Sequence, residues 1–223
     1  MDSGQLKLDT GIFEKQDMRS AMARDSLLAG CEALMSRDFA GAARAFDRGT
    51  TLDPDNPALL HGAAVAARRL GDLGAAEAHY RAAIVVAERR TDDPATNVLA
   101  ITLRLVELYR RQGRDDEAQA LCLRVLCSRH TGQSAIALSR LYVCLAEIYR
   151  RRGQFAAAAH AYRAAIKLRG RIFGDRHPKT VQILSPLSDV CRQLGRYDEA
   201  DDLARRSRTA LGAFEHKSAA GHA

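Results

Sequence analysis

Aromatic residues are scarce in this 223-residue chain, making up only 5% of it, and tryptophan is absent. Proline occurs five times, β-branched residues are sparse, and alanine and leucine dominate. This balance favours helix nearly throughout and argues against a β-sandwich or barrel. No apolar run approaches the roughly 20 residues that a membrane-spanning helix needs. The composition therefore predicts an all-α protein without a membrane span.

The number and spacing of the cysteines do not indicate a disulfide-bonded protein. The count is odd and no two cysteines have CxxC spacing, which disfavours both a disulfide framework and a zinc site. The first 17 residues mix both charge signs and lack an apolar core, so they do not resemble a signal peptide. Together these features predict a cytoplasmic protein. The cysteines are Cys31, Cys122, Cys127, Cys144 and Cys191.

The sequence has no recognisable catalytic or cofactor motif. None of the seven histidines has HExxH spacing, and no glycine-rich phosphate loop of either common type is present. We therefore expect no enzymatic activity, no cofactor and no metal site.

A net charge of +7 comes from 34 basic and 27 acidic side chains, and 29 of the basic residues are arginine, as in many GC-rich bacterial genomes. The excess could favour an acidic partner. Nucleic acid is disfavoured as a partner because lysine is scarce, acidic residues are interleaved and aromatic stacking platforms are few.

What the sequence does contain is an internal repeat. Four copies align on glycines, with an alanine five residues later and a mostly bulky residue nine residues later. A fifth copy precedes them, with Arg37 in the place of the glycine. The spacing from Arg37 to the first glycine is 34 residues, and later spacings are 42, 40 and 42. The aligned positions are Gly71, Gly113, Gly153 and Gly195; Ala42, Ala76, Ala118, Ala158 and Ala200; and Phe46, Tyr80, Cys122, Tyr162 and Ala204.

Apolar residues recur at steps of three and four on both sides of each glycine, which predicts a pair of amphipathic helices. The glycine is placed at the turn, where φ can be positive, and the alanine allows close helix approach. Three proline pairs predict helix starts with Pro at the first position: Asn56-Pro57, Asp93-Pro94 and His177-Pro178. Pro186 predicts a helix break, with Ser185 as a new cap.

This pattern resembles the tetratricopeptide repeat family. The last three copies resemble the longer repeats of kinesin light chains, as in GDRHPKTVQILSPLSDVCRQLGRYDEAD at residues 174–201. The resemblance implies a right-handed α-solenoid of about five helix hairpins over residues 23–212. Its repeats would lie near 23–56, 57–92, 93–132, 133–174 and 175–212. Residues 1–22 are expected to be an extension, a short helix or disordered, and residues 213–223 a disordered tail.

The resemblance further implies that the first helix of each pair lines a concave groove that holds a peptide or helix of a partner protein. Carried over residue by residue, the groove positions are Arg69, Arg104, Glu107, Arg111, Arg140, Glu147, Arg151 and Asp189. The function expected is a non-enzymatic adaptor or scaffold. In a plainer interpretation these charges only pair along their own helices: Glu107 with Arg110 and Arg111, Glu147 with Arg150 and Arg151, and Asp189 with Arg192.

A second hypothesis is a structural protein that assembles into homo-oligomers through the open ends of its repeat array. An exposed apolar end face would support it, supplied by the first helix or by Leu203 and Leu211.

Overall fold

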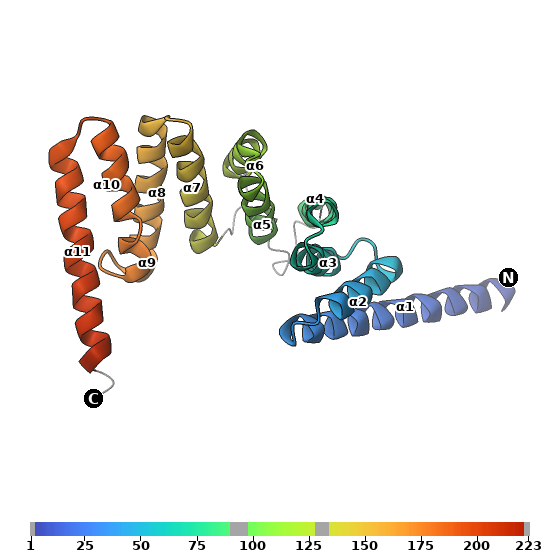
Figure 1. The fold of residues 1–223 in the computed structure, drawn as a ribbon. Helices are drawn as coiled ribbons and strands as arrows, with labels where there is room; N and C mark the ends of the chain where they lie inside the picture. Colours follow the sequence, from blue (N-terminus) through green and yellow to red (C-terminus); the bar gives the residue numbers. More distant parts are fainter. Residues whose placement is uncertain (1–2, 90–97, 128–133, 221–223) are drawn as a thin grey trace. The chain divides into compact units, whose positions relative to one another are not determined.

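A computed structural model describes residues 3–89, 98–127 and 134–220, with side chains described for 16–89, 98–127 and 134–210. All the regular secondary structure within these ranges is helical (Figure 1). The chain divides into two compact units, residues 1–101 and 102–223. Across the ranges described, none of the helices combines the length and apolar character needed to cross a membrane. The expected all-α fold is confirmed.

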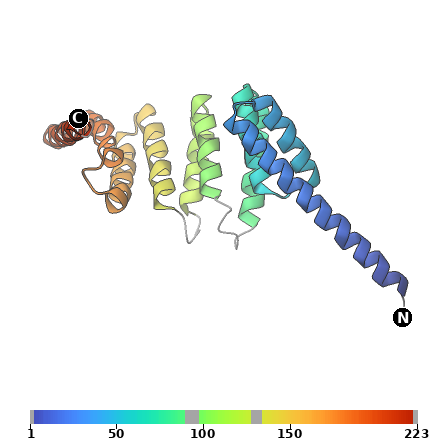
Figure 2. The same cartoon turned by 90° about the horizontal axis from the view of Figure 1, so that it is seen from below.

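The first unit contains α1 (Ser3–Met35), α2 (Phe39–Leu52), α3 (Pro57–Leu70) and α4 (Leu73–Arg89). α1 pairs with α2, α3 pairs with α4, and α2 packs on α3. α1 is one continuous helix that extends well past α2 in both views (Figures 1 and 2). It thus covers most of residues 1–22, where the sequence predicted a short helix or disorder. No proline interrupts this stretch, so the helix continues through its two early glycines.

The second unit begins inside α5 (Val98–Arg111) and continues with α6 (Asp115–Cys127), α7 (Ala135–Arg151), α8 (Phe155–Phe173), α9 (Pro178–Val181), α10 (Leu184–Gln193) and α11 (Tyr197–Ala220). α7 pairs with α8 and α10 with α11, while α6 packs on α7 and α10 on α8. The helical backbone of α11 reaches residue 220, where the sequence predicted a disordered tail from residue 213. This stretch contains no proline, so nothing in it blocks the helical backbone.

The turns between paired helices have the left-handed backbone that the repeat predicted. Gly71, Gly113, Gly153 and Gly195 have φ between 69° and 87°. Arg37, which replaces glycine in the first copy, adopts the same conformation with φ of 62°. An L-residue pays about 1–2 kcal/mol for this backbone, whereas glycine pays little.

The alanine five residues after each turn is a core position. All five of these alanines have no exposed surface. The rings of Phe46, Tyr80 and Tyr162, four residues further on, are equally buried. Phe46 sits where Gly30 of α1 and Gly62 of α3 leave room, since a Cβ on either glycine would overlap its ring. One buried ring therefore holds three helices of the first unit together.

Two of the predicted proline starts are confirmed. The side chain of Asn56 accepts hydrogen bonds from the N–H groups of Ala58 and Leu59, at 3.1 and 3.3 Å, and Pro57 opens α3. His177 caps α9 in the same way, with Nδ1 accepting from the Lys179 N–H at 3.1 Å. The third pair, at residues 93–94, lies outside the described residues.

The helix break near Pro186 is also present, but its cap was predicted wrongly. α9 ends at Val181 and α10 begins at Leu184, so Ile183, not Ser185, is the N-cap residue. Pro186 is then the third residue of α10. In the first turn of a helix the N–H has no intrahelical partner, so a proline there removes no hydrogen bond.

Arg37→Gly should raise the free energy of unfolding by about 1 kcal/mol, because glycine relieves the left-handed strain at this turn. Gly113→Ala places the same strain on another turn and should lower stability by a similar amount. Thermal unfolding followed by circular dichroism measures both. Equal midpoints for wild type and Arg37→Gly would contradict the strain at position 37.

Candidate functional site

A chain of three charged side chains links the first helices of two neighbouring hairpins. Glu107 on α5 accepts from Arg104 on the same helix at 3.4 Å and from Arg140 on α7 at 3.0 Å. These three predicted groove residues are therefore brought together. Each of the three side chains is partly exposed, so the charged group lies at the protein surface, where a ligand could compete for either arginine.

Glu147, also on α7, is held by two donors. Arg150 donates to it at 2.9 Å, and the hydroxyl of the buried Tyr162 donates to its other oxygen. Burial by itself raises the pKa of Glu147, but the hydrogen bonds from Tyr162 and Arg150 outweigh burial, so the pKa lies below its usual value. Burial and the neighbouring carboxylate in turn raise the pKa of Tyr162. Glu147 is thus committed to internal contacts and has little freedom to meet a ligand.

The end of α7 is tied to the start of α6. Arg151 forms an ion pair with Asp115, and Arg152 forms one with Asp116 while donating to the Gln119 side chain at 2.6 Å. Spacing along a single helix does not predict these pairs, because the acidic partners lie on a neighbouring helix. The signal was there: α6 opens with three acidic residues, and α7 ends in a run of arginines one repeat later.

In the second unit, two predicted groove residues are exposed, and the described part of the chain offers them no ion-pair partner: Arg111 at the end of α5 and Asp189 on α10. The expected pairs of Glu107 with Arg110 and Arg111, of Glu147 with Arg151, and of Asp189 with Arg192 do not form. Instead Arg110 donates to Cys144 Sγ at 3.7 Å, and Arg192 pairs with Asp201 on α11 at 3.0 Å. In these two cases the arginine binds an acceptor on a neighbouring helix, because the helices pack close enough to bring that acceptor within reach.

Arg69 belongs to the first unit and has a different environment. Its guanidinium carbon lies 5.6 Å from the centroid of the Phe39 ring, a cation–π contact across the start of α2 and the end of α3.

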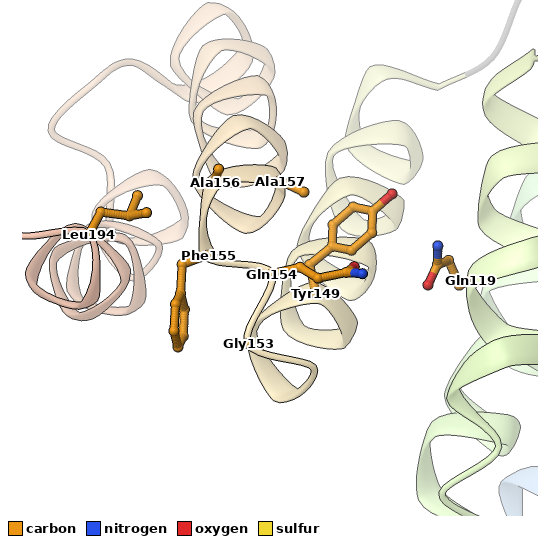
Figure 3. A pocket seen from close by; sticks show the side chains of 8 residues that line it. All are labelled: Gln119, Tyr149, Gly153, Gln154, Phe155, Ala156, Ala157 and Leu194. Atoms are coloured by element: carbon orange, nitrogen blue, oxygen red, sulfur yellow. The ribbon is translucent and has the colours of Figure 1, made fainter.

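An open pocket of about 660 Å³ lies at the hairpin-turn edge of the second unit (Figure 3). Its side chains come from α6, α7, α8 and the residue after α10. None of the eight predicted groove residues lines it. The lining is apolar apart from two glutamine amides and the Tyr149 hydroxyl, and it contains no carboxylate, histidine, cysteine or basic side chain. Its residues are Gln119, Tyr149, Gly153, Gln154, Phe155, Ala156, Ala157 and Leu194.

The described residues contain no group of side chains suited to hold a metal ion. All five cysteines are free thiols. Burial raises the pKa of Cys122 and of Cys144, which makes both poor nucleophiles. The surface described above offers charged groups and hydrogen bonds through which a ligand could bind.

Three family models, each described as tetratricopeptide repeat, match the chain at residues 27–94, 100–136 and 137–212. No curated protein sequence matches it.

Solved structures share the fold over most of the chain. MamA protein superposes with a TM-score of 0.66 and 17% identity, covering 86% of this chain and 92% of that one. A putative kinesin light chain from Podosopora anserina, with nearly identical TPR-like repeats, gives a TM-score of 0.65 and 17% identity, covering 86% of this chain and 95% of that one. RapI gives 0.73 and 9%, covering 89% and 73%. At these identities the likeness concerns the fold alone.

Glu147→Gln should make the free energy of unfolding less dependent on pH in the acidic range. Because the folded pKa of Glu147 is lowered, its contribution is present above the unfolded pKa and is lost as pH falls through the folded value. At neutral pH we expect the variant to lose about 1–2 kcal/mol. Urea unfolding between about pH 3 and pH 7 measures this. Tyr162→Phe, which keeps the carboxylate, should retain part of the acid sensitivity; parallel profiles for Glu147→Gln and wild type would contradict the assignment.

Proposed function

The chain belongs to the tetratricopeptide repeat family, and on that premise we propose that it is a non-enzymatic adaptor that holds an acidic segment of a partner protein. The family's fold supports a role in protein–protein interaction in general. The partner segment would lie along the first helices of the hairpins in the second unit, α5, α7 and α10. The five free thiols fit a reducing compartment, and we infer a cytoplasmic location.

The observation that carries this proposal is the Arg104–Glu107–Arg140 chain. Two guanidinium groups share a single carboxylate, so one positive charge is left over at this junction of α5 and α7. A glutamate or aspartate of the partner can complete the set by accepting from either arginine in bidentate geometry. The exposed Arg111, one turn further along α5, would extend the same positive surface.

A ligand carboxylate can replace Glu107 as the partner of an arginine at a small cost in free energy. A surface ion pair of this kind contributes only about 0.2–1 kcal/mol, so an arginine can turn from Glu107 to a ligand carboxylate at little expense. Arg151 and Glu147 would not take part in this way, since their cross-helix partners hold them in the scaffold. The proposed contact set is therefore narrower than the eight predicted residues: Arg104, Arg111 and Arg140, with Asp189 at the far end.

Photo-crosslinking tests the surface directly. A benzoylphenylalanine at position 111 should form a discrete adduct with a partner protein in native lysate, and the same group at position 205 on α11 should not. Arg104→Gln/Arg140→Gln should weaken binding of the captured partner at least about tenfold, because two charged hydrogen-bond donors are lost. Equal adducts from both positions, or unchanged affinity of the double variant, would contradict the proposed surface.

A second candidate function, self-assembly, is favoured by one observation. α1 exposes large apolar side chains that no other part of the described chain covers, namely Met18, Met22, Leu28 and Met35. The other expected contributor, Leu203, is buried in the core of the second unit, and the side chain of Leu211 lies outside the described residues. Self-adducts from a crosslinker at position 28, with a concentration-dependent mass in solution, would establish this function instead.

A further inference from the structure

Positive charge is concentrated in one short stretch of the chain. Residues 156–188 contain one acidic residue, Asp175, and six basic ones, so this segment holds +5 of the net +7. The basic residues are Arg163, Lys167, Arg169, Arg171, Arg176 and Lys179. The stretch comprises most of α8, the following turn, α9 and the start of α10. α8 is the second helix of its hairpin, so this charge does not belong to the surface proposed above.

Most of these cations are not neutralised within the fold. Elsewhere in the second unit, arginines of α7, α8, α10 and α11 pair with carboxylates, and Arg163 itself pairs with Glu199. Lys167, Arg171, Arg176 and Lys179 are exposed and form no ion pair with the part of the chain that the structure describes. The helix dipole favours a cation such as Arg171 in the last turn of α8, but it does not account for Arg176 and Lys179, which follow the helix.

The segment after α8 is fixed against the helix, so its charges have a defined place. Arg169, nine-tenths buried, donates from Nε to Ser139 Oγ at 3.2 Å and from a terminal nitrogen to the carbonyl of Lys179. Thr180 Oγ1 donates to the Gly174 carbonyl at 2.9 Å. The Lys179 ammonium lies 4.8 Å from the centroid of the Phe173 ring, at the end of α8. Figure 1 shows α9 beside this end of α8.

An exposed apolar side chain accompanies the cations. Ile172, next to Arg171 in the last turn of α8, is 39% exposed. The neighbouring Phe173 stacks on His177, with ring centroids 4.9 Å apart, and also meets the Lys179 ammonium, so its ring is already engaged by neighbours in the fold. Cations beside an exposed aliphatic group, without an aromatic platform, suit an anionic lipid surface better than nucleic acid.

We propose that Lys167, Arg171, Arg176 and Lys179, with Ile172, form a docking surface for anionic phospholipid membranes. The four ammonium and guanidinium groups lie over the lipid phosphates, and Ile172 enters the headgroup region. Each cation near such a surface strengthens binding about fivefold, and four cations together bring the chain to it reversibly. An adaptor with this surface carries its bound partner to a membrane.

Co-sedimentation with vesicles tests the proposal. The full chain should bind vesicles of phosphatidylcholine with about one-third phosphatidylglycerol, and not vesicles of phosphatidylcholine alone. Binding should fall steeply as salt rises from about 50 to 500 mM, because salt screens the charges. Lys167→Gln/Arg171→Gln should lower the partition coefficient about 20- to 30-fold. Both positions are exposed on a helix that glutamine readily forms, so the fold should persist.

The matched control, Arg205→Gln/Arg208→Gln, removes the same charge from exposed positions of α11 and should keep the partition coefficient within about twofold of wild type. Ile172→Ser should lower binding about three- to fivefold without changing its dependence on salt. Equal losses in the two charge variants, no binding to anionic vesicles at low salt, or binding to RNA without binding to vesicles would each overturn the proposal. Partner capture through Arg104 and Arg140 is measured separately and does not depend on these results.

Discussion

Close contact between paired helices at five fully buried alanines is the constraint on which this structure depends. A larger side chain at any of them would force the two helices of a hairpin apart. The left-handed turns place the second helix back on the first, and the buried rings then fill the space that the small residues leave. Because the packed faces of the paired helices are occupied in this way, any binding chemistry has to come from the faces left exposed.

Those remaining faces carry arginine, and close packing decides which acid each arginine meets. Arg140 reaches Glu107, Arg151 reaches Asp115 and Arg163 reaches Glu199, in each case on another helix. Such pairs are worth little individually. They nevertheless divide the charged residues of the second unit into two groups: those that join neighbouring hairpins and those that remain available to bind a partner. Residues that look equivalent in the repeat, such as Arg111 and Arg151, therefore have different roles.

More of the fold than of the ion pairing at the surface could be predicted from the sequence. The turns, the buried alanines and the starts of α3 and α9 depend on local sequence: a glycine, a small residue, or a cap followed by proline. Arg37 was placed at a turn without glycine because the rest of its repeat aligned. Ion pairs could be predicted only in part from spacing along a single helix: Glu147 pairs with Arg150 as expected, but Glu107 bypasses its candidates at three and four residues and binds across to α7. The N-cap of α10 was also predicted wrongly, because Pro186 is compatible with the first turn of a helix as well as with a helix break.

The two units differ in charge in a way that follows from this packing. Residues 1–101 contain 12 basic and 15 acidic side chains, while residues 102–223 contain 22 and 12, a net of −3 against +10. Ion pairs between hairpins engage Arg140, Arg151 and Arg152 of the second unit, and in the acid-poor α8 they engage Arg163. A helix needs no cations at exposed positions to pack, because its stability comes from the buried side. The unpaired cations there are therefore available to an anionic surface outside the fold, and the proposed lipid contact supplies one.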